Sequence, residues 1–109
     1  MKDKKEKTIQ QLSGRQVRFL RGLGHHLEVK VSIGRDGITR NLVAATQAIL
    51  LSDELVKVKV GSGCELERAA AADLLAGKTA AALVQVLGKT FLLFRENPDR
   101  KDGQRIVLP

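Results

Sequence analysis

Residues 55–60 read Leu-Val-Lys-Val-Lys-Val and are followed directly by the turn residues 61–63, Gly-Ser-Gly. In an extended chain this alternation places the valines on one face and the lysines on the other. The pattern is typical of a β-strand with one buried face. An alanine-rich helix is then expected over residues 65–76, with Gly77 as its stop. The stretch therefore predicts a strand, turn and helix unit, the building block of an α/β fold.

The same organisation continues towards the N-terminus. Residues 29–33 alternate as a second strand, and residues 38–51 have the apolar spacing of a helix, with Thr39 as its N-cap. Ser13 opens a sequence with capping-box spacing, so a first helix is expected from there until just before His25.

Two apolar runs follow the alanine-rich helix, at 82–87 and 91–94, and the turn residues 88–90 between them predict an antiparallel hairpin. The order α-β-α-β-α-β-β predicts a two-layer α/β sandwich with a four-stranded mixed sheet, whose helical connections imply parallel neighbours. Residues 106–108 are apolar and are expected to dock on a sheet edge. The alanine-rich helix is expected to bury Leu66, Ala70 and Leu74.

Length and composition describe one domain with a hydrophobic core. The 109 residues, 43% of them hydrophobic, suffice for one core without covalent staples. A single cysteine, Cys64, cannot form an intramolecular disulfide or a cysteine zinc cluster, and it favours a reducing, cytoplasmic compartment. No apolar run approaches the roughly 18 residues of a membrane span. Residues 1–10 lack a signal sequence and are expected to form a flexible tail.

Charge predicts a polyanionic partner. Nineteen Lys and Arg against twelve Asp and Glu leave a net charge of +7, and the isoelectric point is about 10.0. Such a balance favours nucleic acid, although a basic stripe on a helix is often only a solvated face. The residues expected to form the basic surface are Arg15, Arg18, Arg21, Lys30, Lys57, Lys59 and Lys89.

The loop between the second helix and the strand before it has a Gly-x-x-Gly sequence. Glycines at both ends let the backbone approach a ligand closely, and the following helix directs free N–H groups at an anion. The guanidinium fork of the loop arginine suits phosphate. With three Phe and no Tyr or Trp, the chain lacks an aromatic platform for stacking bases, so the loop is expected to hold a backbone. The loop residues are Gly34, Arg35, Asp36 and Gly37.

Other candidate sites are weaker. Gly77-Lys-Thr and Gly88-Lys-Thr resemble the end of a P-loop but lack the glycine five positions earlier. His25 and His26 are expected to cap a helix, Cys64 to pack as a small apolar residue, and the pair at 53–54 to lie in a loop. No catalytic residue, metal or cofactor is therefore expected, and the chain is not predicted to be an enzyme.

Four blocks of sequence, at 12–27, 31–39, 54–59 and 86–95, occur in the order and spacing of a known family. Together they resemble the CRM domain (chloroplast RNA splicing and ribosome maturation), in its stand-alone bacterial YhbY-type form. The resemblance implies a fold similar to the C-terminal domain of bacterial translation initiation factor three. It also implies RNA binding that involves the Gly-x-x-Gly loop, with ribosomal RNA of large-subunit precursors as the partner.

These observations together predict a CRM-type RNA-binding domain over residues 11–96, a C-terminal extension over 97–109, and a monomeric ribosome-assembly factor. Two alternatives stay open. One is an RNA-binding module of another pathway, and the other is a protein-interaction domain whose basic surface meets an acidic partner.

Overall fold

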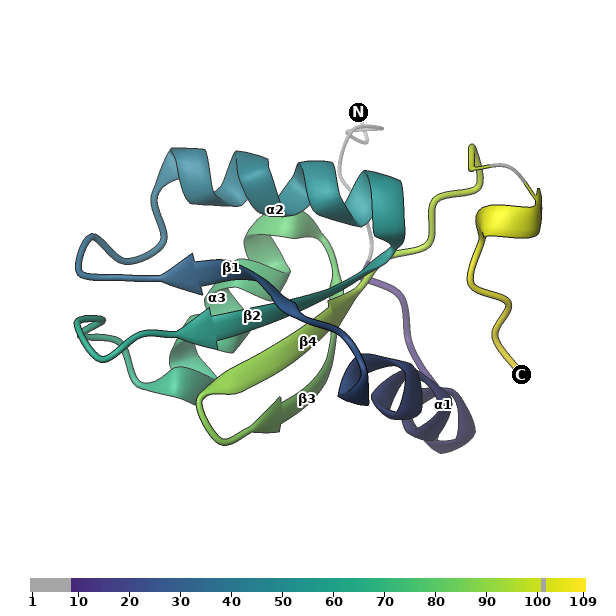
Figure 1. Ribbon diagram of the computed structural model, residues 1–109, viewed down its shortest axis with the longest axis horizontal. Coiled ribbons are helices and arrows are strands. Elements are labelled where there is room, and N and C mark those ends of the chain that lie inside the picture. Colours follow the sequence, from purple (N-terminus) through teal and green to yellow (C-terminus); the bar gives the residue numbers. More distant parts are fainter. Residues whose placement is uncertain (1–8, 101) are drawn as a thin grey trace, which may run out of the picture.

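The computed structural model describes residues 9–100 and 102–109, so most of the predicted N-terminal tail lies outside the described residues. Figure 1 shows a twisted sheet with helices packed against it. The elements, in order, are α1 (Gly14–His25), β1 (Val29–Ile33), α2 (Arg40–Asp53), β2 (Leu55–Val60), α3 (Arg68–Thr79), β3 (Ala82–Leu87), β4 (Thr90–Phe94) and a 3-10 turn (Asp102–Gln104). The predicted order and the α/β class with a four-stranded mixed sheet are confirmed.

Side-chain caps begin the first two helices. The Ser13 hydroxyl accepts from the Gln16 backbone N–H at 3.1 Å, and the Gln16 side chain accepts from the Ser13 N–H at 3.0 Å. This reciprocal pair is the predicted capping box. The Thr39 hydroxyl accepts from the Leu42 N–H at 3.1 Å, so Thr39 caps α2 as expected. The helix ends differ from prediction by one or two residues, since α1 includes His25 and α2 spans 40–53.

The prediction for α3 was wrong in its bounds and its buried face. The helix spans 68–79 rather than 65–76 and runs through Gly77, and Ala80 takes the left-handed conformation that ends it (φ 56°). Leu66, Ala70 and Leu74 are exposed. The buried face instead consists of Ala71, Ala72, Leu75, Ala76 and Thr79. An alanine-rich helix has little contrast between its faces, so its apolar pattern does not fix which side meets the sheet.

The sheet order is β1-β2-β4-β3. β1 and β2 are parallel, and β4 is antiparallel to both β2 and β3. The hairpin of β3 and β4 is confirmed, whereas the expectation that each helical connection joins parallel neighbours holds only for β1 and β2. The last strand lies between β2 and β3, so those two strands run in the same direction without touching.

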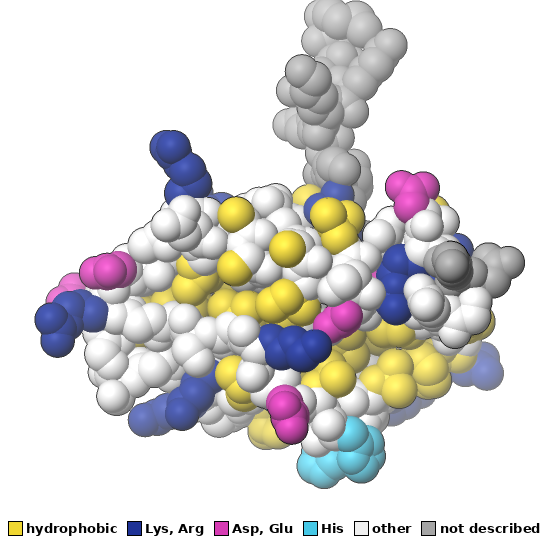
Figure 2. Space-filling model, turned by 45° about the horizontal axis from the view of Figure 1, so that its top comes forward, with side chains coloured by type: hydrophobic (Ala, Val, Ile, Leu, Met, Phe, Trp, Pro, Cys, Tyr) yellow, Lys and Arg dark blue, Asp and Glu magenta, His cyan; other side chains and the backbone are white. Residues whose placement is uncertain are grey.

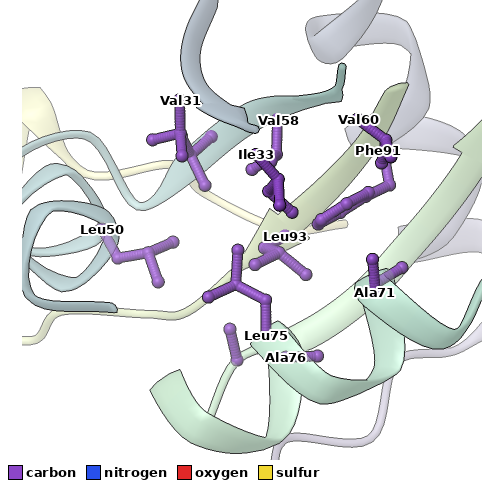
Figure 3. Packing of buried hydrophobic residues seen from close by; sticks show 13 residues of the cluster. Val31, Ile33, Leu50, Val58, Val60, Ala71, Leu75, Ala76, Phe91 and Leu93 are labelled. Carbon is purple, nitrogen blue, oxygen red and sulfur yellow. The ribbon is translucent and has the colours of Figure 1, made fainter. Parts of the chain in front are cut away.

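Two hydrophobic clusters lie on opposite faces of the sheet. The larger packs α2 and α3 against the sheet, with Phe91, Leu93 and Ile33 fully or almost fully buried (Figure 3). The smaller lies under α1 and includes Leu20, Leu55, Val84, Leu92 and Phe94. Burial of each such side chain contributes roughly 1.5–3 kcal/mol to stability.

The apolar residues near the C-terminus join the smaller cluster. Ile106 and Leu108 pack against it beside α1, on a face of the sheet. The expectation that they dock on a sheet edge was therefore wrong. Among the described residues, no helix is long and apolar enough to cross a membrane.

Candidate nucleic-acid interface

The first helix covers only part of its face of the sheet and leaves an open groove beside it. The groove has a volume of about 500 Å³ and opens to solvent. Its floor is the middle of β2, β4 and β3, and one wall is α1. The polar and charged side chains that line it are Arg18, Arg21, His25, Lys57, Gln85 and Thr90.

Close approach of α1 to the sheet sets the depth of the groove. Gly24 is buried and faces Leu92 on β4. A Cβ on Gly24 would lie 2.8 Å from Leu92 Cδ2 and closer still to Cδ1, a distance that real side chains do not tolerate. Glycine is therefore required here if α1 is to rest on β4 at this distance. A larger residue would force either the Leu92 side chain or the helix to shift.

Three cations converge on the groove from two elements. Arg18 and Arg21 project from α1, and Lys57 projects from β2 on the face opposite the buried valines. Lys57 is half-buried, so its methylene stem packs against the sheet while its ammonium reaches the groove. None of the three forms an ion pair with another described residue. Like charges gathered without acidic neighbours create a positive potential that attracts anions.

The Gly-x-x-Gly loop lies at one end of the sheet, beyond the groove. β1, β2 and β3 run in the same direction, so the loops that follow them gather at this end, which we call the loop end (residues 34–39, 61–67 and 88–89). Figure 1 shows the first two of these loops side by side. In Figure 2, Lys and Arg side chains stand out from the same end, with acidic side chains beside them.

The two glycines of the loop have different roles. The Gly37 N–H donates to the Gly34 carbonyl at 3.0 Å and closes a turn, with Gly37 in the left-handed region (φ 72°). Gly34 has an ordinary φ, and a Cβ there would meet no atom within 4 Å. Of these two glycines, only Gly37 has a backbone conformation that favours glycine, and Gly34 leaves space open in front of the backbone. Arg35 and Asp36 are exposed at the tip.

Neighbouring loops support the loop end. The Gly61 N–H donates to the Ile33 carbonyl at 2.8 Å, and Gly63 lies beside Arg35, where a Cβ would make an ordinary van der Waals contact of 3.7 Å with the Arg35 backbone nitrogen. Arg68 at the start of α3 donates to the Gly88 carbonyl at 2.8 Å. These contacts hold the three loops together as one surface.

The structure brings only some of the predicted basic residues together. Arg18, Arg21 and Lys57 share the groove. Lys59 is exposed on β2 one alternation further towards the loop end, roughly 7 Å along the strand, and Lys89 is exposed on the hairpin. Lys59 therefore lies between the groove and the loop end, on the same face of β2 as Lys57.

Two predicted basic residues lie outside that surface. Arg15 is exposed on α1 but does not line the groove. Lys30 sits at a bulge of β1 and donates to the Asp53 carboxylate at 2.9 Å. This hydrogen bond, with a smaller one from Ser52, holds the pKa of Asp53 below its usual range despite partial burial. The Lys30 charge is therefore offset within the protein.

The groove also contains residues that the sequence pattern did not single out. Gln85, Leu87 and Thr90 flank the β3–β4 turn, and Leu87 is 61% exposed although apolar. The other apolar residues of the hairpin are buried or half-buried, and the sequence pattern alone does not show that Leu87 differs from them. His25 lines the groove, whereas His26 is the helix C-cap, and the two rings meet edge to face 5.4 Å apart.

The chain matches the family model described as the CRS1 / YhbY (CRM) domain over residues 12–95, which is most of its length and contains both the groove and the loop. The chain belongs to the CRM domain family. Within the part of the chain that the structure describes, no group of three or more His, Cys, Asp or Glu side chains is placed to hold a metal.

Two relatives and one solved structure match this chain along nearly their whole length. The probable RNA-binding protein YqeI of Bacillus subtilis is 35% identical over 98 residues, which cover 90% of this chain and 99% of YqeI. An RNA-binding protein of Haemophilus influenzae is 34% identical, with 83% and 91% covered. The solution structure of a hypothetical Staphylococcus aureus protein proposed to bind RNA superposes with a TM-score of 0.74 at 33% identity, covering 91% of this chain and all of that one.

Proposed function

We propose that this chain binds RNA by gripping its phosphate backbone along the surface that joins the groove to the loop end. The observation that carries the proposal is the convergence of Arg18, Arg21 and Lys57 on one open groove without an acidic partner among the described residues. Phosphate supplies the missing negative charge, and each contact releases counterions from the RNA. The names of the relatives, which describe RNA-binding proteins, agree with this ligand.

The aromatic residues support recognition of backbone and shape. Phe91 and Phe94 are buried in the two clusters, and Phe19 on α1 is partly exposed. One partly exposed phenyl ring does not make the multi-ring platform on which RNA-binding sheets stack successive bases. Ribose and phosphate contacts, with local shape, are therefore proposed to dominate affinity.

The loop is proposed to act as the second contact. Gly34 leaves the backbone open to a ligand, and Arg35 at the tip offers a bidentate donor to a phosphate oxygen. The start of α2 adds the positive end of its dipole, and Arg40 in its first turn adds a further charge.

The RNA is proposed to be ribosomal RNA of large-subunit precursors, and the role to be ribosome assembly, as a monomer in the cytoplasm. This finer proposal rests on the resemblance to stand-alone YhbY-type proteins. Cofractionation with precursor particles on sucrose gradients, followed by crosslinking to identify the RNA, tests it. Absence from those particles, with RNA binding intact, would favour a module of another pathway.

Salt dependence tests RNA binding itself. If about five cations contact phosphates, the logarithm of affinity for a structured ribosomal RNA fragment should fall with the logarithm of salt at a slope of roughly −3.5 to −4.5. No binding at low salt would refute the proposal. Binding that an acidic polypeptide displaces as readily as RNA does would favour the protein-interaction alternative.

A variant pair tests the loop. Gly34→Asp introduces a negative charge where the structure has room for a side chain, so the fold is retained and RNA affinity should drop at least tenfold. Gly77→Asp makes the same charge change on α3, which covers the other face of the sheet, and is the matched control. Equal affinity of the two variants would remove the loop from the RNA contact.

A further inference from the structure

The C-cap residue of α2 is a fully buried glutamate. Glu54 has 0% exposure and takes the left-handed conformation, with φ 68°. Glycine or asparagine is usual at such a position, because a side chain costs free energy there. Glutamate is therefore unfavourable here by backbone conformation alone. Residues that break such a local rule often make a tertiary contact that compensates for it.

The Glu54 carboxylate binds the C-terminal segment (residues 97–109) with both oxygens. Oε1 accepts from the Ile106 N–H at 2.7 Å and from Arg100 Nη1 at 3.2 Å. Oε2 accepts from the Asn97 N–H at 2.7 Å, and Arg105 Nε, which is buried without a hydrogen-bond partner, lies 3.9 Å from it. One buried carboxylate therefore fixes the segment at its beginning and near its end.

From this anchor the segment reaches α1. Ile106 and Leu108 pack against the cluster that contains Leu20 of α1. The Gln16 side chain, in the first turn of α1, donates to the Pro109 carbonyl at 3.3 Å. Figure 1 shows the yellow C-terminal end of the chain descending towards α1. The segment thus completes the contact by which α1 rests on the sheet.

α1 meets the sheet through a narrow face. It carries Arg18 and Arg21, two of the three groove cations; its buried residues are Leu20 and Gly24, and Val17 packs partly buried beside them. A helix held by so narrow a face depends on every neighbour of that face for its position. The C-terminal segment is one of those neighbours, and Glu54 holds it in place.

We infer that Glu54 and the C-terminal segment form a latch that fixes α1, and with it the width of the groove, so that Glu54 is a positioning residue for RNA. The inference rests on the proposed function. Glu54 does not line the groove, and it acts through the segment that it binds.

Glu54→Gln is the sharpest test, because glutamine has the same shape. Each carboxylate oxygen accepts a backbone N–H at 2.7 Å, so the amide nitrogen of glutamine would place a donor against a donor in either orientation. Asp73→Asn is the matched control, since Asp73 is an exposed acid on α3, which covers the other face of the sheet, and the change in net charge is identical.

Two measurements on the whole 109-residue chain test the effect of Glu54→Gln on α1 and on RNA binding. Hydrogen exchange of the α1 and C-terminal amides should accelerate at least tenfold in Glu54→Gln, while α3 and β4 amides keep their protection. Affinity for structured RNA should fall about tenfold, and the salt slope should lose about 1.4–1.8, the share of two phosphate contacts. The control should match the parent in both.

A milder variant covers the case in which Glu54→Gln does not fold. Leu108→Asp leaves the carboxylate contacts in place and weakens only the packing beside α1, so the same pattern should appear to a smaller extent. Unchanged α1 exchange in a folded Glu54→Gln protein would overturn the latch. Faster exchange with unaltered RNA affinity would overturn the positioning role. If the parent itself does not bind RNA, the proposed function fails while the exchange data still decide the latch.

Discussion

Replacing Lys57 by methionine removes one charge from the floor of the groove and keeps an unbranched side chain on β2. The ammonium makes no ion pair with a described residue, so the free energy of unfolding should change by less than about 0.5 kcal/mol. A hydrogen bond to a charged group contributes about 1.5–3 kcal/mol net. Because each 1.4 kcal/mol is a tenfold change, the Kd for RNA should rise at least about tenfold.

Fluorescence anisotropy with a labelled ribosomal RNA fragment, titrated at several salt concentrations, measures both the Kd and its dependence on salt. The loss of one phosphate contact should reduce the magnitude of the salt slope by about 0.7–0.9, in addition to the loss of affinity. Lys78→Met is the control, because Lys78 is exposed at the end of α3, which covers the opposite face of the sheet. It makes the same change in net charge far from the groove.

The comparison of the two variants decides whether RNA affinity depends on the position of the lysine in the groove or only on the net charge of the protein. If Lys78→Met weakens binding as much as Lys57→Met, the RNA responds to the net charge of +7 and not to the groove. If Lys57→Met retains the parent affinity and slope, the groove is not where phosphate binds. Either result refutes the reasoning from convergent cations.

Three further predictions concern the fold. Gly37→Ala should lower the free energy of unfolding by about 1 kcal/mol because φ is 72°, whereas Gly34→Ala should leave it nearly unchanged. Urea denaturation measures both variants. A larger loss in Gly34→Ala than in Gly37→Ala would contradict the loop geometry. Leu75→Ala should cost about 2–5 kcal/mol and Leu74→Ala less than about 1 kcal/mol; equal losses by the same assay would contradict the face assigned to α3. The folded-state pKa of Asp53 is lowered, so its ion pair stabilises above the unfolded pKa of about 3.9 and is lost as pH falls through the folded value. Asp53→Asn should therefore be less stable than the parent by at most about 1 kcal/mol near neutral pH, with the gap closing in acid; a gap that persists at pH 2 would count against the pair.

Sequence patterns predicted the elements that depend on interactions between residues close in sequence. The alternation in β2, the capping box at Ser13 and the turn between β3 and β4 each depend on residues that are close in sequence, and all three are present. The face of α3 could not be predicted, because alanines surround the helix and two choices of buried side differ little in apolarity. The sheet order depends on the position of β4 between β2 and β3, and no pattern of neighbouring residues indicates that position.

The candidate interface was predictable only in part. A spacing of three residues is shorter than one helical turn, so successive arginines drift around α1. Arg18 and Arg21 reach the groove, whereas Arg15 does not. Glu54 was expected to lie in a loop, and it is instead buried at the end of α2. Its partners are 43 to 52 residues further along the chain, a separation at which sequence pattern carries no signal.

The central place of β4 governs when the protein can fold during its own synthesis. β2 remains an edge strand until the last strand of the sheet has been made, and it pairs with β4 from Leu55↔Phe94 to Lys59↔Thr90. A nascent chain that ends before residue 94 would expose the unpaired side of β2, a feature that promotes association with other chains. Residues 90–94 complete the sheet, and Ile106 and Leu108 complete the cluster under α1, so the domain is expected to fold cooperatively only after these residues have been made.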